Sequence, residues 1–151
     1  MPKEQAPIVT NHTLREDQDR RKLRVLVAED NTVNQMVATK MLEKMGYRAD
    51  VAGNGREAVE AQERLPYDVI LMDCQMPELD GFEATKLIRE HERLSGERHV
   101  PIIALTANAM KGDRDRCIEA SMDDYVAKPI KRDELSAAIG RCLGLSQEST
   151  G

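Results

Sequence analysis

Tryptophan is absent from this chain of 151 residues, and one phenylalanine and three tyrosines supply all of its aromatic side chains. A core must therefore be built from Val, Ile, Leu, Met and Ala, and a hydrophobic content of 40% is enough to build one. No apolar run approaches the roughly 20 residues of a membrane span. The first twenty residues also lack the apolar stretch of a signal peptide. The length predicts one domain.

An excess of basic residues is also missing, since 22 Lys and Arg face 27 Asp and Glu and give a net charge of −5. This balance argues against general affinity for nucleic acid or for an anionic membrane surface. The three cysteines are odd in number and irregularly spaced, at Cys74, Cys117 and Cys142. They indicate reduced thiols in a cytoplasmic protein rather than a disulfide framework.

The chain divides into a polar start and a patterned remainder. Residues 1–21 are rich in charge and show no period, which predicts a flexible tail or linker. Residues 22–145 are expected to form the folded domain, and residues 146–151 a short tail. From Leu23 onward, short apolar runs rich in Val and Ile alternate with helical patterns.

Five strands and five helices are expected in strict alternation. The predicted strands are 23–28, 47–52, 68–72, 102–105 and 125–127. The predicted helices are 31–45 with Asn31 as its cap, 56–65, 82–94, 108–120 and 132–143. The fourth helix is weak, and Gly112-Asp113 is expected to interrupt it. Such an alternation predicts an α/β protein with a small, doubly wound parallel sheet.

Residues able to handle a phosphate or a metal follow four of these apolar runs. Glu29 and Asp30 follow the first run, and Asp73 follows the third. Thr106 follows the fourth, and Lys128 follows the fifth. Because the carboxyl ends of parallel strands share one edge, these side chains are expected to meet in one crevice. Three acids, a hydroxyl and an ammonium suit a magnesium-dependent site that accepts a phosphoryl group.

Four motifs in this order resemble those of the receiver domain of response regulators. They are Val-Leu-Val-Ala-Glu-Asp-Asn at 25–31, Leu-Met-Asp-Cys-Gln-Met-Pro-Glu-Leu-Asp-Gly at 71–81, Ala-Leu-Thr-Ala-Asn-Ala at 104–109 and Asp-Asp-Tyr-Val-Ala-Lys-Pro at 123–129. In its general sequence character, the chain most resembles the receivers of hybrid sensor histidine kinases. The resemblance covers residues 23 to about 143. It implies a flavodoxin-like five-stranded sheet in the order 2-1-3-4-5, bound Mg²⁺, and an aspartate phosphorylated by a phosphohistidine.

The resemblance also implies a set of ligands for the metal. Asp30 and Asp73 would bind Mg²⁺ directly, Glu29 directly or through water, and Gln75 through its carbonyl. Mn²⁺ is expected to substitute. The family often has Asp where Glu29 stands, and usually has Gly where Ser121 stands. A left-handed backbone at Ser121 would be strained.

Asp73 is the predicted nucleophile, because it alone follows the central third strand. Lys128 and Thr106 would neutralise and hydrogen-bond the transferred phosphoryl group. In this family the bond between Lys128 and Pro129 is typically cis. Thr106 and Tyr125 are the expected switch pair, with the helix after Thr106 as the moving element. Gln75 and Asn108 flank the pocket and are expected to tune the lifetime of the phosphate.

As a receiver, the chain would be a signalling domain rather than a conventional enzyme, although it would catalyse its own phosphorylation and a slow autodephosphorylation. Its partners would be a histidine kinase or a histidine phosphotransfer domain, and a kinase covalently linked in the parent protein is a further possibility. Nucleic acid and direct membrane contact are not expected.

Three other interpretations compete with this one. Residues 53–58, Gly-Asn-Gly-Arg-Glu-Ala, formally fit a dinucleotide-binding fingerprint, although Asn-Gly is also a plain turn signal. A phosphatase with an aspartyl nucleophile usually has a second acid two residues later, where this chain has Gln75. An interaction module that keeps the fold without being phosphorylated would normally have lost an acid or the lysine, and none is lost here.

Overall fold

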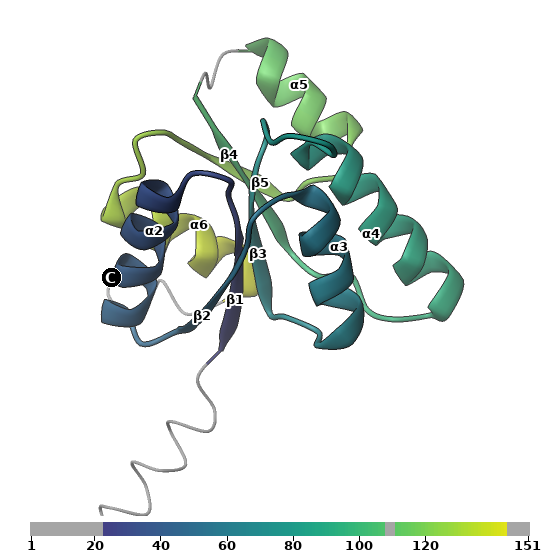
Figure 1. Cartoon of the computed structure of the whole chain (residues 1–151), viewed down its shortest axis with the longest axis horizontal. Coiled ribbons are helices and arrows are strands. Elements are labelled where there is room, and N and C mark those ends of the chain that lie inside the picture. Colours follow the sequence, from purple (N-terminus) through teal and green to yellow (C-terminus); the bar gives the residue numbers. More distant parts are fainter. Residues whose placement is uncertain (1–22, 108–110, 145–151) are drawn as a thin grey trace, which may run out of the picture.

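The computed structural model describes residues 23–107 and 111–144, which form three layers with a parallel sheet between two layers of helices (Figure 1). The elements are β1 (Arg24–Ala28), α2 (Thr32–Lys44), β2 (Arg48–Ala52), α3 (Gly55–Arg64), β3 (Val69–Asp73), α4 (Gly81–Ser95), β4 (Ile102–Thr106), α5 (Lys111–Glu119), β5 (Asp124–Ala127) and α6 (Arg132–Leu143). All strand pairs are parallel, in the order β2-β1-β3-β4-β5. The predicted fold class and strand order are confirmed. The predicted tails, 1–21 and 146–151, lie outside the described residues.

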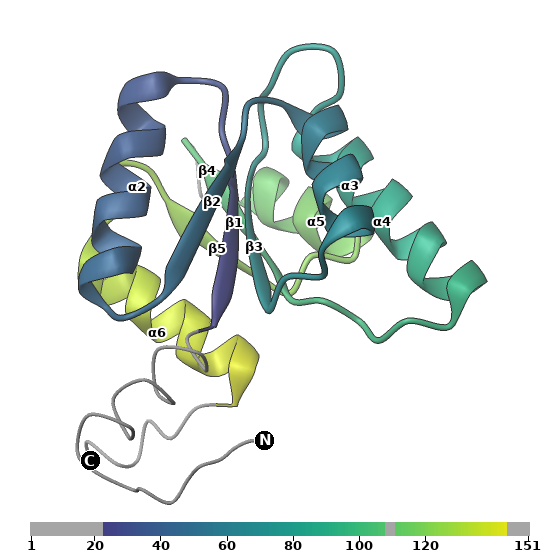
Figure 2. The same ribbon diagram turned by 60° about the horizontal axis from the view of Figure 1, so that its bottom comes forward.

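Successive side chains of the central strands supply two separate cores, one on each face of the sheet. In β1, Val25 and Val27 pack with α2 and α6, whereas Leu26 and Ala28 pack with α3, α4 and α5. Figure 2 shows the same division of the helices between the two faces. Strands β1, β3 and β4 are buried on both faces, which explains their continuous apolar sequences.

Side chains with oxygen acceptors begin the helices next to the carboxyl edge of the sheet. Asn31 accepts from the Asn34 amide at 3.0 Å, and Asn54 accepts from the Glu57 amide at 2.8 Å. Asp80 and Glu83 form a reciprocal capping box at the start of α4. These caps satisfy amides that the helices leave unpaired, and they fix where each loop of the edge ends.

Two glycines allow close backbone contacts behind this edge. A Cβ atom at Gly55 would lie 2.2 Å from the Leu79 carbonyl oxygen, and one at Gly81 would lie 2.2 Å from the Asp73 carbonyl oxygen. Gly55 therefore serves the packing of α3 against the loop before α4, and Asn54 is the cap of that helix. Helix capping and close packing therefore explain the glycine-rich turn at 53–58, and dinucleotide binding is not needed to explain it.

Helix α5 corrects one expectation from the sequence. It runs without a break from Lys111 to Glu119, although an interruption at Gly112-Asp113 was predicted. A glycine inside a helix costs only about 1 kcal/mol relative to alanine. The burial of Cys117 and Ala120 against the core outweighs that cost. The predicted start at residue 108 lies outside the described residues.

An ion-pair network closes the amino edge of the sheet, opposite the caps. Arg89 of α4 donates to the carbonyl oxygens of Ser121 at 3.0 Å and Val100 at 2.8 Å. Its guanidinium also pairs with Asp123 at 2.8 Å and Glu92 at 3.0 Å. This arginine therefore ties α4 to the beginning of β4 and to the corner between α5 and β5. Ser121 in that corner has a φ of +70°, the left-handed conformation that the family's usual glycine accommodates more easily.

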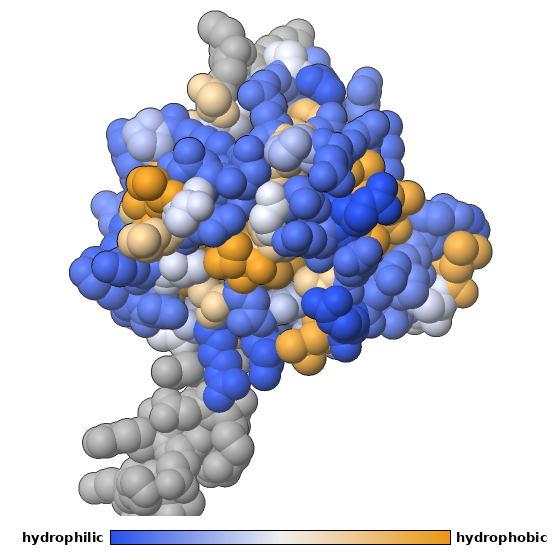
Figure 3. All heavy atoms as spheres, in the orientation of Figure 1, coloured by the Kyte–Doolittle hydropathy of each residue, from blue (hydrophilic) through white to orange (hydrophobic). Residues whose placement is uncertain are grey.

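The surface is mostly hydrophilic, with separate apolar areas on the face seen in Figure 3. Val33 and Met36 of α2 are among the exposed apolar side chains, at 66% and 53% exposure. Among the described residues, no helix combines the length and the hydrophobicity that crossing a membrane requires.

Candidate phosphoryl-acceptor and metal site

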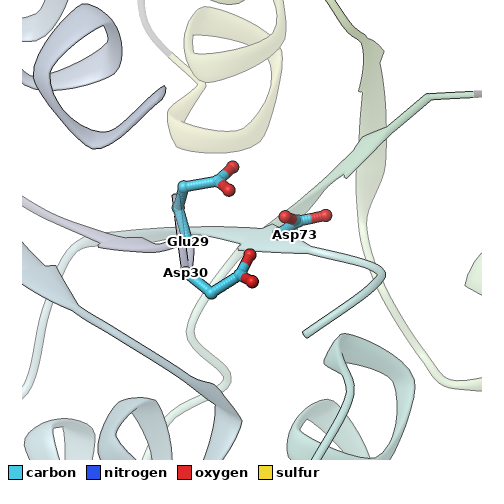
Figure 4. A group of neighbouring side chains, drawn as sticks. All are labelled: Glu29, Asp30 and Asp73. Carbon is cyan, nitrogen blue, oxygen red and sulfur yellow. The ribbon is translucent and has the colours of Figure 1, made fainter. Parts of the chain in front are cut away.

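Three carboxylates meet at the carboxyl edge of the sheet. Glu29 and Asp30 follow β1, and Asp73 ends the neighbouring strand β3. One oxygen from each of the three lies within 4.8 Å of the others, and Figure 4 shows the carboxylates gathered in one place. Glu29 and Asp73 are buried, at 1% and 3% exposure, whereas Asp30 is exposed. The pairing of β1 with β3 therefore produces the predicted acidic cluster.

Lys128 follows β5 and reaches two of these acids across the edge. Its Nζ lies 2.9 Å from Asp73 Oδ2 and 3.3 Å from Glu29 Oε1. Burial lowers the pKa of the Lys128 ammonium, but Asp73 and Glu29 together outweigh burial and raise that pKa above its usual value. Lys128 therefore remains a cation. The bond between Lys128 and Pro129 is cis, as the resemblance implied.

The hydrogen bonds of Glu29 are incomplete in a way that suits a metal. Its Oε2 accepts from the Asn31 amide at 3.1 Å and from the side-chain amide of Asn34 at 3.5 Å. Its Oε1 is buried and has no aligned hydrogen bond, because the contact with Lys128 is ionic only.

The charge of the site also suits a divalent cation. Three carboxylates and one ammonium leave two negative charges uncompensated. Carboxylate oxygens are the ligands that Mg²⁺ prefers. Mg²⁺ is thus the ion that this cluster fits, with Glu29, Asp30 and Asp73 as the residues that would hold it.

Thr106 ends β4 beside Asp73, but its hydroxyl is already engaged. Its Oγ1 donates to Asp113 Oδ2 of helix α5 at 2.6 Å. Both residues line a cavity of about 50 Å³ together with Asp73, Lys128 and Arg116. Arg116 also lies over the ring of Phe82, with its Cζ 4.1 Å from the ring centroid. Asp113 and Arg116 had no signal in the sequence, because their helix is mostly polar and shows no apolar period.

Of the remaining predicted residues, Gln75 lines this cavity. Gln75 is exposed, and its backbone amide donates to Asp73 Oδ1 at 3.1 Å. Tyr125 is half-buried on β5, with the guanidinium of Arg114 5.9 Å from its ring centroid. Asn108 lies outside the described residues. The roles expected of these three residues stay predictions.

Cys74 lines the same cavity and is buried. A hydrogen bond with the Cys117 thiol, together with burial, raises the pKa of Cys74, so its thiol stays protonated. A protonated, buried thiol is a poor nucleophile.

Comparison with known proteins agrees with this geometry. The family model of the response regulator receiver domain matches residues 25–140. A similar relative is the hybrid signal transduction histidine kinase K of Dictyostelium discoideum, 48% identical in an alignment of 131 residues that covers 84% of this chain and 11% of the relative. The chain spans only 6% to 16% of the length of the curated relatives reported as most similar.

Two solved structures are similar along nearly their full length. One is the receiver domain of a sensor histidine kinase from Pseudomonas aeruginosa PAO1, with a magnesium ion coordinated in the active-site cleft. It is 50% identical, with a TM-score of 0.74 over 82% of this chain and 98% of that one. The other is the receiver domain of Ssk1 from Saccharomyces cerevisiae, crystallised with the histidine phosphotransfer protein Ypd1. It is 34% identical, with a TM-score of 0.76 over 82% and 90%. Fold, acidic edge and sequence together place this chain in the response regulator receiver domain family, as a signalling domain of two-component phosphorelays.

Proposed function

We propose that Asp73 accepts a phosphoryl group from a phosphohistidine, with Mg²⁺ bound by Glu29, Asp30 and Asp73. The observation that carries this proposal is the arrangement around Asp73. Its carboxylate lies within 4.8 Å of the two other acids, and its Oδ2 lies 2.9 Å from Lys128 Nζ. The backbone carbonyl of Gln75 is the predicted fourth protein ligand, and Mn²⁺ is the predicted substitute for Mg²⁺.

The residues around the acceptor serve a transfer that depends mainly on charge. A carboxylate oxygen of Asp73 forms a bond to phosphorus while the bond from phosphorus to the histidine nitrogen breaks, and the bonding electrons stay on the imidazole. Bound Mg²⁺ supplies charge neutralisation to the phosphoryl oxygens. Lys128 contributes a second positive charge, with its Nζ 2.9 Å from Asp73 Oδ2. The product is an acyl phosphate, which water cleaves slowly in the predicted autodephosphorylation.

The surface of α2 beside the site suits a helical partner that carries the histidine. Val33, Met36 and Val37 are exposed at 66%, 53% and 42%. Val37 also lines a groove of about 120 Å³ that reaches Glu29, Lys128 and Ile130. An apolar strip next to an acceptor would let the apolar face of a helix dock and present its histidine. The histidine phosphotransfer protein bound to the similar Ssk1 receiver supports a partner of this class.

The remaining parts of the proposal concern context and output. A cytoplasmic location is part of the proposal, as is a position within or beside a histidine kinase, which the similar hybrid kinases support. Thr106 and Tyr125 form the proposed switch pair, with Tyr125 filling the space that Thr106 vacates when it approaches the phosphoryl group. Gln75 and Asn108 are proposed to set the access of water to the acyl phosphate.

Acetyl phosphate provides a direct test without a kinase. Incubation with Mg²⁺ should add one phosphoryl group to the wild-type chain, measured by intact-mass spectrometry. The Asp73→Asn variant should gain none, because the amide is not a nucleophile for this transfer. Removal of Mg²⁺ by EDTA should abolish the label as well.

Asp115→Asn is the matched control, because Asp115 is an exposed acid of α5 outside the cluster. It should be labelled as the wild type is. Persistent labelling of Asp73→Asn would place the acceptor elsewhere. A wild-type chain that takes no label would favour the interaction module that is never phosphorylated.

A further inference from the structure

The hydroxyl of Thr106 has a strong partner in the unphosphorylated structure. It donates to Asp113 Oδ2 at 2.6 Å, a short distance that fits a charged acceptor. Thr106 is buried at 2% exposure and Asp113 is half-buried, so water competes little for this bond. The contact joins the end of β4 to the first turns of α5.

The same contact faces the space where a phosphoryl group would arrive. Thr106, Asp113, Asp73 and Lys128 line one small cavity. A hydroxyl group has one proton, so it cannot donate fully to Asp113 and to a phosphoryl oxygen at once.

We propose that Asp113 is a positioning residue that holds the Thr106 hydroxyl away from the acceptor until phosphorylation. This inference rests on the proposed function of Asp73 as the acceptor. Phosphorylation then exchanges one acceptor of the Thr106 proton for another. The exchange frees the side of α5 that Asp113 had tied to β4. Asp113 lowers the population of the phosphoryl-competent state, so its removal should raise the affinity of the site for a phosphoryl group.

The test uses the full chain, Mg²⁺ and beryllofluoride, which mimics a phosphoryl group on a carboxylate. The measurement is the midpoint of a beryllofluoride titration, followed by the amide resonances of α5 in NMR spectra. Asp113→Ala should lower the midpoint about tenfold, the size expected for losing a competing hydrogen bond to a charged group. Asp113→Asn keeps an acceptor without the charge and should fall between Asp113→Ala and wild type. Asp115→Ala on the exposed side of the same helix should leave the midpoint within twofold of wild type.

The decisive comparison repeats Asp113→Ala in a Thr106→Val background, where there is no hydroxyl to hold. In that background, Asp113→Ala should lower the midpoint of the beryllofluoride titration by less than twofold. If Asp113→Ala lowers the midpoint equally in both backgrounds, the effect is one of negative charge in general and the inference is overturned. The inference is also overturned if the midpoint changes in neither background. If Asp113→Ala does not fold by circular dichroism, Asp113→Asn carries the same pair of comparisons.

Different results would refute the proposed function of Asp73 and the inferred role of Asp113. A wild-type chain that neither binds beryllofluoride nor takes a label from acetyl phosphate refutes the acceptor role of Asp73, and Asp113 loses its role with it. Wild-type binding with an unchanged midpoint in Asp113→Ala refutes the role of Asp113 alone.

Discussion

A single ammonium group stands between two buried carboxylates in this site. Lys128 Nζ contacts both Asp73 and Glu29, and Asp30 lies close to those two acids. At an effective dielectric near 20, two carboxylates about 5 Å apart repel each other by about 3 kcal/mol. One lysine cannot cancel three such charges. The proposed affinity for a divalent cation would therefore arise from a repulsion that the fold itself imposes.

Tyr67 gives a prediction for alkaline pH. Its hydroxyl donates to Asp50 Oδ2 at 2.7 Å, and burial together with Asp50 raises the pKa of Tyr67 to about 12. A group whose pKa is raised on folding stabilises the protein fully below its unfolded pKa of about 10. That stabilisation is lost as the pH rises from about 10 through about 12. The free energy of unfolding should therefore fall more steeply over this range in wild type than in Tyr67→Phe.

Absorbance at the tyrosinate band provides the measurement, beside urea unfolding at each pH. The step near pH 12 should disappear from the titration of Tyr67→Phe and persist in Tyr47→Phe. A wild-type titration in which every tyrosine ionises near pH 10 would contradict the assignment.

The sequence was informative about single residues where a strand ends and uninformative inside the polar helix. Glu29, Asp73 and Lys128 could be predicted to converge, because parallel strands end at one edge. Asp113 could not, because it is one of several charges in a helix without an apolar stripe. Its importance depends on a tertiary contact with Thr106 that no local pattern records. The strained conformation of Ser121 was foreseen only through the family's usual glycine.

Among the helices, α4 begins in close contact with the end of β3, the strand that carries Asp73. Its first residue, Gly81, approaches the Asp73 carbonyl so closely that a Cβ atom would lie 2.2 Å from that oxygen. The Gly81 amide also donates to the Cys74 carbonyl at 3.1 Å. The position of the Asp73 backbone therefore depends on the absence of a side chain at the start of α4.

Two alanine substitutions should have opposite effects on stability. Gly81→Ala should lower the free energy of unfolding by about 1–3 kcal/mol, as overpacking does, and should also slow labelling of Asp73. Gly112→Ala should raise it by about 0.5–1 kcal/mol, because a helical alanine replaces a glycine and its Cβ meets no atom within 4 Å. Urea unfolding measures both effects. Equal changes in the two variants would contradict the close contact at Gly81.

The elements themselves could be predicted from the pattern to within a few residues, because central strands buried on both faces show up as apolar runs. The predicted break in α5 was wrong, because the low helix propensity of Gly112 costs less free energy than the packing of the helix against the core contributes. Cys117 and Ala120 hold that helix to the core despite its polar composition.

For the molecule as a unit, the proposed Mg²⁺ site predicts a stability that depends on the Mg²⁺ concentration. An ion that binds only the folded chain raises the free energy of unfolding by an amount set by its concentration. Mg²⁺ at ten times its dissociation constant should add about 1.4 kcal/mol, which is about 5 °C in Tm for a domain of this size. Thermal unfolding at matched ionic strength measures the shift.

The Asp30→Asn substitution should shift Tm in opposite directions without and with Mg²⁺. Without Mg²⁺ the variant should melt slightly higher than wild type, because one of three mutually repelling charges is gone. With Mg²⁺ it should melt lower, because a ligand has been lost. Asp115→Asn should keep the full Mg²⁺ shift, and a shift that survives in Asp30→Asn would place the cation elsewhere.

Helix α5 is held at both of its ends by contacts of different kinds. Beyond its last residue, the Ser121 carbonyl is fixed by Arg89 at the edge far from the acceptor. Near its start, Asp113 accepts a hydrogen bond from the Thr106 hydroxyl. Nine residues make a rod about 13 Å long, so a tilt of 10° about the Ser121 corner moves the other end by about 2 Å. In the proposed exchange, the Thr106 proton would change partner at the cleft, and α5 would tilt about its far end and shift the outer surface of the domain sideways.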